Sequence, residues 1–193
     1  MPNAYQLDAL ADLGIRVGDL GCIMLDVDAP VPIADVIPRA WEYSSDSPML
    51  RHVSGIQDEH HLTLLYGLLP QVRRWHVDEV LDGWTGLDVA VTTDMLDVFP
   101  SPIPDEPYSC IVARQSWGAG DEILNAHQRL SLLPHINTHP VFKAHVTLAY
   151  VHADRTDDAI TELRRAFGAD GEVVTIRFRP TALNYGAVVG SSS

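Results

Sequence analysis

The sequence has few cysteines and no long apolar run, and each shortage excludes a class of protein. Its 193 residues include only two cysteines, Cys22 and Cys110, so the chain is not a disulfide-rich secreted scaffold. Both lie in apolar segments, where a free thiol behaves as a small apolar side chain. No apolar run approaches the roughly eighteen residues that a membrane-spanning helix needs, and the first residues lack the pattern of a secretion signal. We therefore expect a soluble, cytoplasmic protein.

Basic residues are also scarce, since 26 acidic residues face 13 basic ones and the formal net charge is -13. Such a chain repels polyanions at long range, so we expect neither long duplex nucleic acid nor a membrane as a partner. A phosphate-bearing partner should instead be a small nucleotide or a short oligonucleotide. Hydrophobic residues make up 46% of the chain, which is enough for a sizeable core.

Short apolar segments alternate with helical patterns, and the same order of elements occurs twice. The expected strands cover residues 21–29, 61–69, 87–99, 108–115, 141–151, 172–178 and 181–189. The expected helices cover residues 33–44, 73–84, 121–133 and 156–167. Four prolines fall within residues 100–107, so we expect this segment to connect two halves of a single domain, 1–99 and 108–189. Residues 190–193 are typical of a flexible tail.

Each half contains a His-x-Thr segment on an expected strand, "HLTLLY" from His61 and "HVTLAY" from His145. Alternate side chains of a strand point to opposite faces, so each histidine shares a face with its threonine, Thr63 or Thr147. An expected strand before each motif also matches, with "GCIM" in the first half and "SCIV" in the second. Cys22 precedes His61 by 39 residues, and Cys110 precedes His145 by 35. A duplication of this kind predicts a pseudo-symmetric domain in which the two pairs face each other across a cleft.

Two imidazoles and two hydroxyls on facing strands suit phosphodiester chemistry. Histidine titrates near neutral pH, so it can activate a water or hydroxyl as a base, or protonate a leaving oxygen as an acid. Threonine hydroxyls can donate to the non-bridging phosphoryl oxygens. Such a site requires no metal and no cofactor.

These residues resemble the 2H phosphoesterases, a family that includes LigT-like RNA cyclic phosphodiesterases. The family carries two His-x-Thr/Ser motifs, which "HLTLLYG" and "FKAHVTLAY" resemble, although Ala144 replaces the proline common before the second histidine. The resemblance implies a bilobal α+β fold with a pseudo-two-fold axis, in which antiparallel sheets line a central cleft and helices lie outside. It implies that His61 and His145 are the acid/base pair, in either order, and that Thr63 and Thr147 bind phosphate.

Residues near the two motifs are further candidates for substrate contacts. Lys143 lies two residues before His145 and so on the same face of the strand, where it would help to hold a phosphate. Arg114 is a similar cation near the end of an expected strand. Tyr66 and Tyr150 follow the histidines by five residues, which in a regular strand favours packing in the core over contact with substrate, unless a bulge at Gly67 turns Tyr66 back.

Other histidines have simpler explanations. His60 should point away from its neighbour His61. A metal site formed by His52, His60, His61 and His76 would match no standard ligand spacing, so we expect no metal. His127 and His135 lie in helix or loop settings and are expected at the surface.

The sequence thus predicts a metal-independent phosphodiesterase that acts on a cyclic or 2',5'-type phosphodiester in a nucleotide or cyclic oligonucleotide, or on a 2',3'-cyclic phosphate at an RNA end. Two alternatives remain open. One is a nucleotide-binding module on the same fold without catalysis. The other is an ordinary α/β interaction domain in which the repeat is accidental.

Overall fold

The computed structural model describes residues 10–46, 53, 55–57, 59–86, 88–115, 121–137 and 141–186. The expected tail, 190–193, lies outside this part of the chain. The strands are β1 (Gly21–Asp28), β2 (His60–Leu68), β3 (Val89–Thr92), β4 (Leu96–Pro100), β5 (Tyr108–Arg114), β6 (His145–His152) and β7 (Thr175–Asn184). The helices are α2 (Ile33–Val36), α3 (Arg74–Leu81), α4 (Glu122–Leu130) and α5 (Thr156–Ala166).

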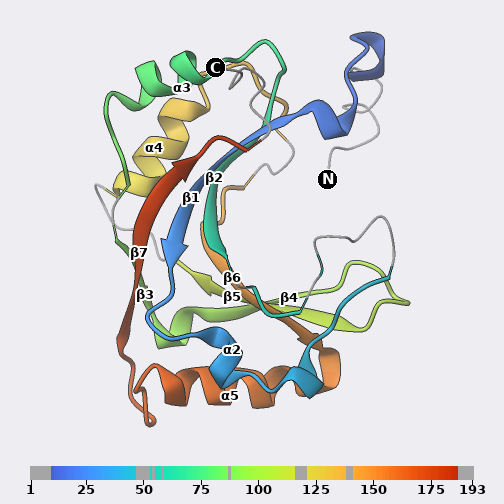
Figure 1. Ribbon diagram of the computed structural model, residues 1–193, viewed down its shortest axis with the longest axis vertical. Helices are drawn as coiled ribbons and strands as arrows, with labels where there is room; N and C mark the ends of the chain where they lie inside the picture. Colours follow the sequence, from blue (N-terminus) through green and yellow to red (C-terminus); the bar gives the residue numbers. More distant parts are fainter. Residues whose placement is uncertain are drawn as a thin grey trace.

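All seven strands belong to one antiparallel sheet in the order β3-β7-β1-β2-β6-β5-β4. The sheet curls like half a barrel, with α3 and α4 outside one end and α2 and α5 outside the other (Figure 1). α4 contacts β2, and α5 contacts β5 and β6. β2 and β6, the strands that carry the His-x-Thr segments, are neighbours at the centre of the sheet.

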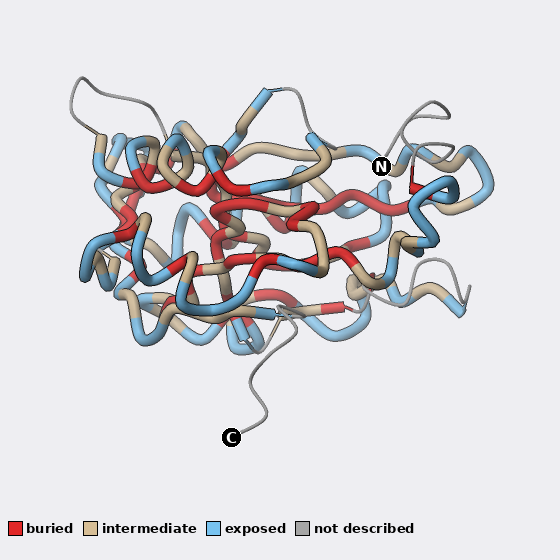
Figure 2. Tube along the Cα trace, turned by 90° about the horizontal axis from the view of Figure 1, so that it is seen from above, coloured by how far each residue is buried: buried red, intermediate tan, exposed pale blue. Residues whose placement is uncertain are grey.

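The core lies between the outer face of the sheet and these helices, and Figure 2 shows the buried residues as a band inside the exposed ones. In β1, Ile23 and Leu25 are fully buried on the helix side, whereas Cys22 and Asp26, on the opposite face, are partly exposed. Each buried aliphatic side chain of this kind contributes about 1.5–3 kcal/mol relative to exposure. The alternation of apolar and polar residues therefore determines which face of the sheet packs on the helices and which face is open to a ligand.

The expected strand 87–99 is two strands that lie at opposite edges of the sheet. β3 pairs with β7 and β4 pairs with β5, and a 3₁₀ turn, η4 (Thr93–Met95), separates them. Thr93 is buried, and its hydroxyl accepts a hydrogen bond from the backbone N–H of Val174 at 3.1 Å. The prediction of one strand was wrong because the apolar alternation continues through the turn, so the pattern gives no sign of the break.

The expected strands 172–178 and 181–189 show the reverse error, because residues from both form the single strand β7 (Thr175–Asn184). Residues 187–189 of the second expected strand lie outside the described part of the chain. Pro180 lies within β7, next to a register shift against β1, and a bulge is a position where a strand tolerates proline.

The proline-rich segment 100–107 joins β4 to β5, which are adjacent antiparallel strands. β4 thus lies beside β5 although its residues belong to the expected first half, while β7, from the second half, lies beside β1. The two sides of the sheet therefore do not coincide with the expected halves of the sequence.

Candidate active site

The four His-x-Thr side chains lie on one face at the centre of the sheet. Leu62 and Val146 are paired across β2 and β6, and both are fully buried on the helix side. In this antiparallel register His61 lies opposite Thr147, and Thr63 lies opposite His145. Directly opposed side chains share a face, with Cβ atoms about 4.5–5.5 Å apart. Each histidine is thus beside the threonine of the other strand, and all four residues are partly exposed.

Both strands contain a bulge one residue after the threonine. Leu64 has no partner on β1, since Thr63 pairs with Met24 and Leu65 pairs with Ile23. Likewise Leu148 has no partner on β5, where the register shifts between Ile111 and Val112. An extra residue of this kind reverses the alternation of the side chains that follow it.

The bulges turn Tyr66 and Tyr150 to the His-x-Thr face, where both are partly exposed. The expectation about their face was therefore wrong for both tyrosines, although Tyr150 does pack against the buried ring of Tyr108. For Tyr66, the bulge that matters is at Leu64. Gly67 also lies at a register shift, but it follows Tyr66 and cannot change its face. Gly67 has a φ of 97°, and a Cβ there would lie 2.3 Å from the carbonyl oxygen of Ile136, so only glycine fits.

A cysteine from the neighbouring strand lies beside each threonine of the site. Cys110 Sγ is 4.0 Å from Thr147 Oγ1, and Cys22 lies beside Thr63. Burial raises the pKa of Cys22 to about 11, although Thr63 lowers it, so this thiol stays protonated near neutral pH. Cys110 Sγ donates toward Thr147 Oγ1, which leaves the Thr147 hydroxyl proton available to another acceptor. Both cysteines are free thiols, and the "GCIM" and "SCIV" match was the sequence signal for their shared position.

The ring of His145 is held in one orientation and one tautomer. Its Nδ1 lies 2.7 Å from the carbonyl oxygen of Lys143. A carbonyl can only accept, so Nδ1 carries the proton and Nε2 of the neutral ring holds the lone pair. Phe99 packs edge-on against the ring, with centroids 5.0 Å apart. Lys143 thus contributes its backbone carbonyl, while its side chain is exposed.

The two histidines have opposite charges beside them. His61 is paired with Asp26 on β1, whose carboxylate also accepts from Asn184 Nδ2 at 3.2 Å. His145 is paired with Arg114 on β5, and Arg114 forms an ion pair with Asp97. Burial lowers the pKa of both imidazoles. Asp26 opposes that effect at His61, and the bond to the Lys143 carbonyl opposes it at His145, where the charges of His61 and Arg114 add to it.

His60 is buried, as expected for the face opposite His61, and it connects the two motif strands. Its Nδ1 lies 3.1 Å from the carbonyl oxygen of Thr147, so its ring links β2 to β6 just beyond the Leu62–Val146 pair. It also lines a hollow of about 600 Å³ at the end of β1, together with Asp26, Asp28, Glu59 and Gln57. Three carboxylates, those of Asp26, Asp28 and Glu59, line this hollow.

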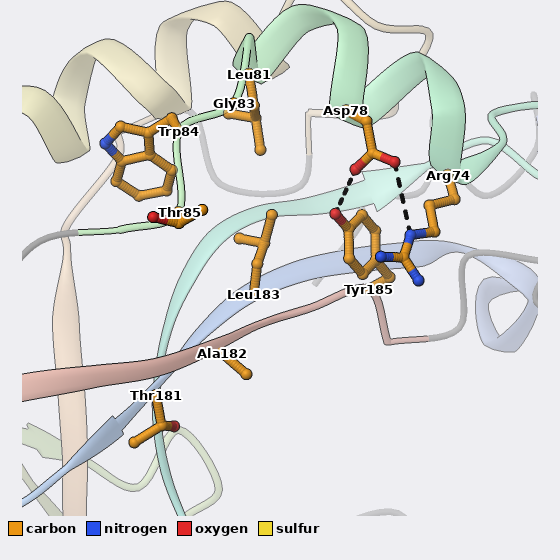
Figure 3. Close-up of a pocket in the computed structure, with 10 residues that line it drawn as sticks. All are labelled: Arg74, Asp78, Leu81, Gly83, Trp84, Thr85, Thr181, Ala182, Leu183 and Tyr185. Carbon is orange, nitrogen blue, oxygen red and sulfur yellow. Dashed lines mark hydrogen bonds and ion pairs between the residues drawn. The ribbon is translucent and has the colours of Figure 1, made fainter.

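A second cavity, of about 510 Å³, lies between α3 and β7 and contains none of the four His-x-Thr residues. In Figure 3 the Tyr185 hydroxyl donates to Asp78, which also pairs with Arg74. Within the described part of the chain, no group of three or more His, Cys, Asp or Glu side chains is arranged to hold a metal ion. None of the described helices has the length and apolar character needed to cross a bilayer.

No protein-family model and no curated protein matches the chain. Similar solved structures include Usb1 of Kluyveromyces marxianus and the same protein with uridine monophosphate. Both have 10% sequence identity to this chain and a TM-score of 0.42. The alignment with Usb1 alone covers 86% of this chain and 96% of Usb1. The alignment with the uridine monophosphate complex covers 88% of this chain and 98% of Usb1. A likeness of this size assigns neither a family nor an activity to this chain.

Proposed function

We propose that the protein is a metal-independent phosphodiesterase of the 2H type, with His61 and His145 as the acid/base pair. The observation that carries this proposal is the shared face on which each histidine lies beside the other strand's threonine. A phosphate ester bound there meets hydroxyl donors for its non-bridging oxygens, and it has an imidazole available for the attacking and for the leaving oxygen.

In this proposal His145 is the base and His61 is the acid. The bond from His145 to the Lys143 carbonyl leaves the lone pair on Nε2, and Arg114 disfavours protonation of that ring. Asp26 favours the protonated form of His61. His145 removes a proton from water, the water oxygen bonds to phosphorus, the bond from phosphorus to the leaving oxygen breaks, and His61 protonates that oxygen.

The proposed substrate is small: a nucleotide or cyclic oligonucleotide with a cyclic or 2',5'-type phosphodiester, or a short RNA end with a 2',3'-cyclic phosphate. The net charge of -13 opposes long polyanions. The carboxylates of Asp26, Asp28 and Glu59 around the hollow at the end of β1 oppose a further phosphate there. Tyr66 and Tyr150 offer aromatic surface for a base on the same face as the histidines.

We also infer that β1–β2 and β5–β6 are related by an approximate two-fold axis, as in a bilobal 2H-like fold. Support comes from matched pairs in the two halves of the sheet. Cys22 pairs with Tyr66 and Cys110 pairs with Tyr150, and in each motif strand a bulge, at Leu64 or Leu148, precedes the tyrosine.

The test is a product screen by mass with cyclic mononucleotides, cyclic di- and trinucleotides, 2',5'-oligoadenylate and RNA ends with cyclic phosphate. The wild type should hydrolyse at least one of these in the presence of a chelator, and the His61→Ala/His145→Ala double variant should hydrolyse none. Nucleotide binding without product over the whole panel would instead favour a silent binding module. Neither binding nor product would favour an interaction domain.

A further inference from the structure

We propose that His127, on the outer side of the sheet, is a positioning residue that braces both His-x-Thr strands. This inference rests on the proposed function, because it concerns how that active site is held in shape. His127 lies on α4, which packs on β2 opposite the His-x-Thr face. It touches no residue of the acid/base pair, so any effect on turnover passes through the backbone.

The first contact of His127 is to the bulge of β2. Its Nδ1 lies 2.7 Å from the carbonyl oxygen of Leu64, and because a carbonyl only accepts, this nitrogen donates. Leu64 is the residue without a partner on β1. The bond therefore satisfies the backbone carbonyl of Leu64, the bulge residue. This bulge reverses the alternation of the side chains and so turns Tyr66 to the His-x-Thr face.

The corresponding bulge of β6 is supported differently. There the carbonyl of Leu148 accepts from the backbone N–H of Gln57 at 3.2 Å. A backbone donor cannot be removed by changing a side chain, whereas the donor to Leu64 can. The bulge next to Thr63 therefore depends on one side chain, and the bulge next to Thr147 does not.

The second contact of His127 is to the segment that leads into β6. Its ring stacks on Phe142, with centroids 3.8 Å apart and planes 7° apart. Phe142 directly precedes Lys143, whose carbonyl fixes the tautomer of His145. One imidazole thus supports the backbone after Thr63 and the backbone before His145.

Three substitutions separate the two contacts. His127→Asn retains a side-chain N–H near the position of Nδ1 and loses most of the stack. His127→Phe retains the stack and loses the donor. His127→Ala loses both and should lower kcat by about tenfold, the equivalent of one or two weak interactions, while His127→Asn and His127→Phe should each lose less than His127→Ala.

Stability alone must be separated from positioning. Ile123→Val, on the same side of α4, is the matched control, because it should lower the free energy of unfolding slightly without changing either contact. It should retain the wild-type kcat. Wild-type kcat in His127→Ala, or an equal loss in Ile123→Val at equal stability, would overturn the proposal.

A spectroscopic measurement keeps this test independent of the proposed reaction. The ring ¹⁵N shifts of His145 report whether Nδ1 still carries the proton, and the Tyr66 ring signals report its surroundings. Both should change in His127→Ala and stay as in the wild type in Ile123→Val. If the wild type hydrolyses no phosphodiester, the proposed function fails. The positioning role of His127 is refuted separately, by unchanged spectra in His127→Ala.

Discussion

The two His-x-Thr strands carry the same groups in the same order, yet their surroundings differ. Beside His61 lies a carboxylate, Asp26, and beside His145 lies a guanidinium, Arg114. The ring of His145 is fixed by a backbone carbonyl, whereas no hydrogen bond to His61 is found among the described residues. Equal motifs therefore do not imply equal roles, and this difference in charge is one reason for proposing His145 as the base and His61 as the acid.

The strongest test of the comparison removes each imidazole alone. His61→Ala and His145→Ala should each lower kcat by at least about 100-fold, because general acid or base catalysis contributes about 10²–10⁴-fold. His152→Ala, at the exposed end of β6, is the control and should keep full activity. Steady-state rates on the substrate found in the screen are the measurement. Full activity in both single variants would falsify the proposed mechanism.

The threonines should matter next, and more equally than the histidines. Thr63→Val and Thr147→Val keep the shape of the strand and remove a donor to the phosphoryl oxygens. Loss of one such donor costs about 100-fold in kcat in comparable sites. Thr63→Ser and Thr147→Ser should restore most of the rate, as measured by kcat on the same substrate. If valine is tolerated at either position, that hydroxyl does not contact the phosphate.

The two tyrosines should separate binding from stability. Tyr150 packs against Tyr108, with ring centroids 5.7 Å apart, so Tyr150→Ala should lower the free energy of unfolding, by about 2 kcal/mol for a partly buried ring. Tyr66→Ala should instead raise KM by about fivefold or more, if a base stacks there. Denaturant unfolding and steady-state kinetics distinguish the two outcomes. Equal effects of both variants on KM would mean that both rings contact the substrate.

The sequence was sufficient to predict the paired strands, the shared face of His61 and Thr63, and the helices α4 and α5, because these follow from periodicity and repetition. It could not reveal the bulges, since Leu64 and Leu148 look like ordinary strand residues. The face of Tyr66 was therefore predicted wrongly. Nor could it reveal the support from His60 and His127, because each bonds to a backbone carbonyl of another element, and such contacts leave no pattern in a single chain.

The neighbouring charges offer a finer test, with effects of opposite sign. Asp26→Asn removes the group that favours protonated His61, so the pKa of His61 should fall further. Arg114→Gln removes a cation beside His145, so the pKa of His145 should rise. NMR titration of the two ring Cε1–H signals measures both. A shift of the same sign in the two variants would contradict the assignment of His61 as acid and His145 as base.

The smallest expected effect is on stability as a function of pH. Burial lowers both histidine pKa values in the folded state, so below the unfolded pKa of about 6.5 the unfolded chain binds more protons than the folded one. The free energy of unfolding should therefore be highest above this pH and should decrease as the pH falls below it, until the folded-state pKa values are passed. Asp26 partly restores the pKa of His61, and the bond to the Lys143 carbonyl partly restores that of His145, where His61 and Arg114 lower it. His61→Gln and His145→Gln should therefore each remove part of this pH dependence, as measured by urea unfolding between about pH 5 and 8. An unchanged pH dependence in both variants would show that burial does not lower the pKa of either imidazole in the folded protein.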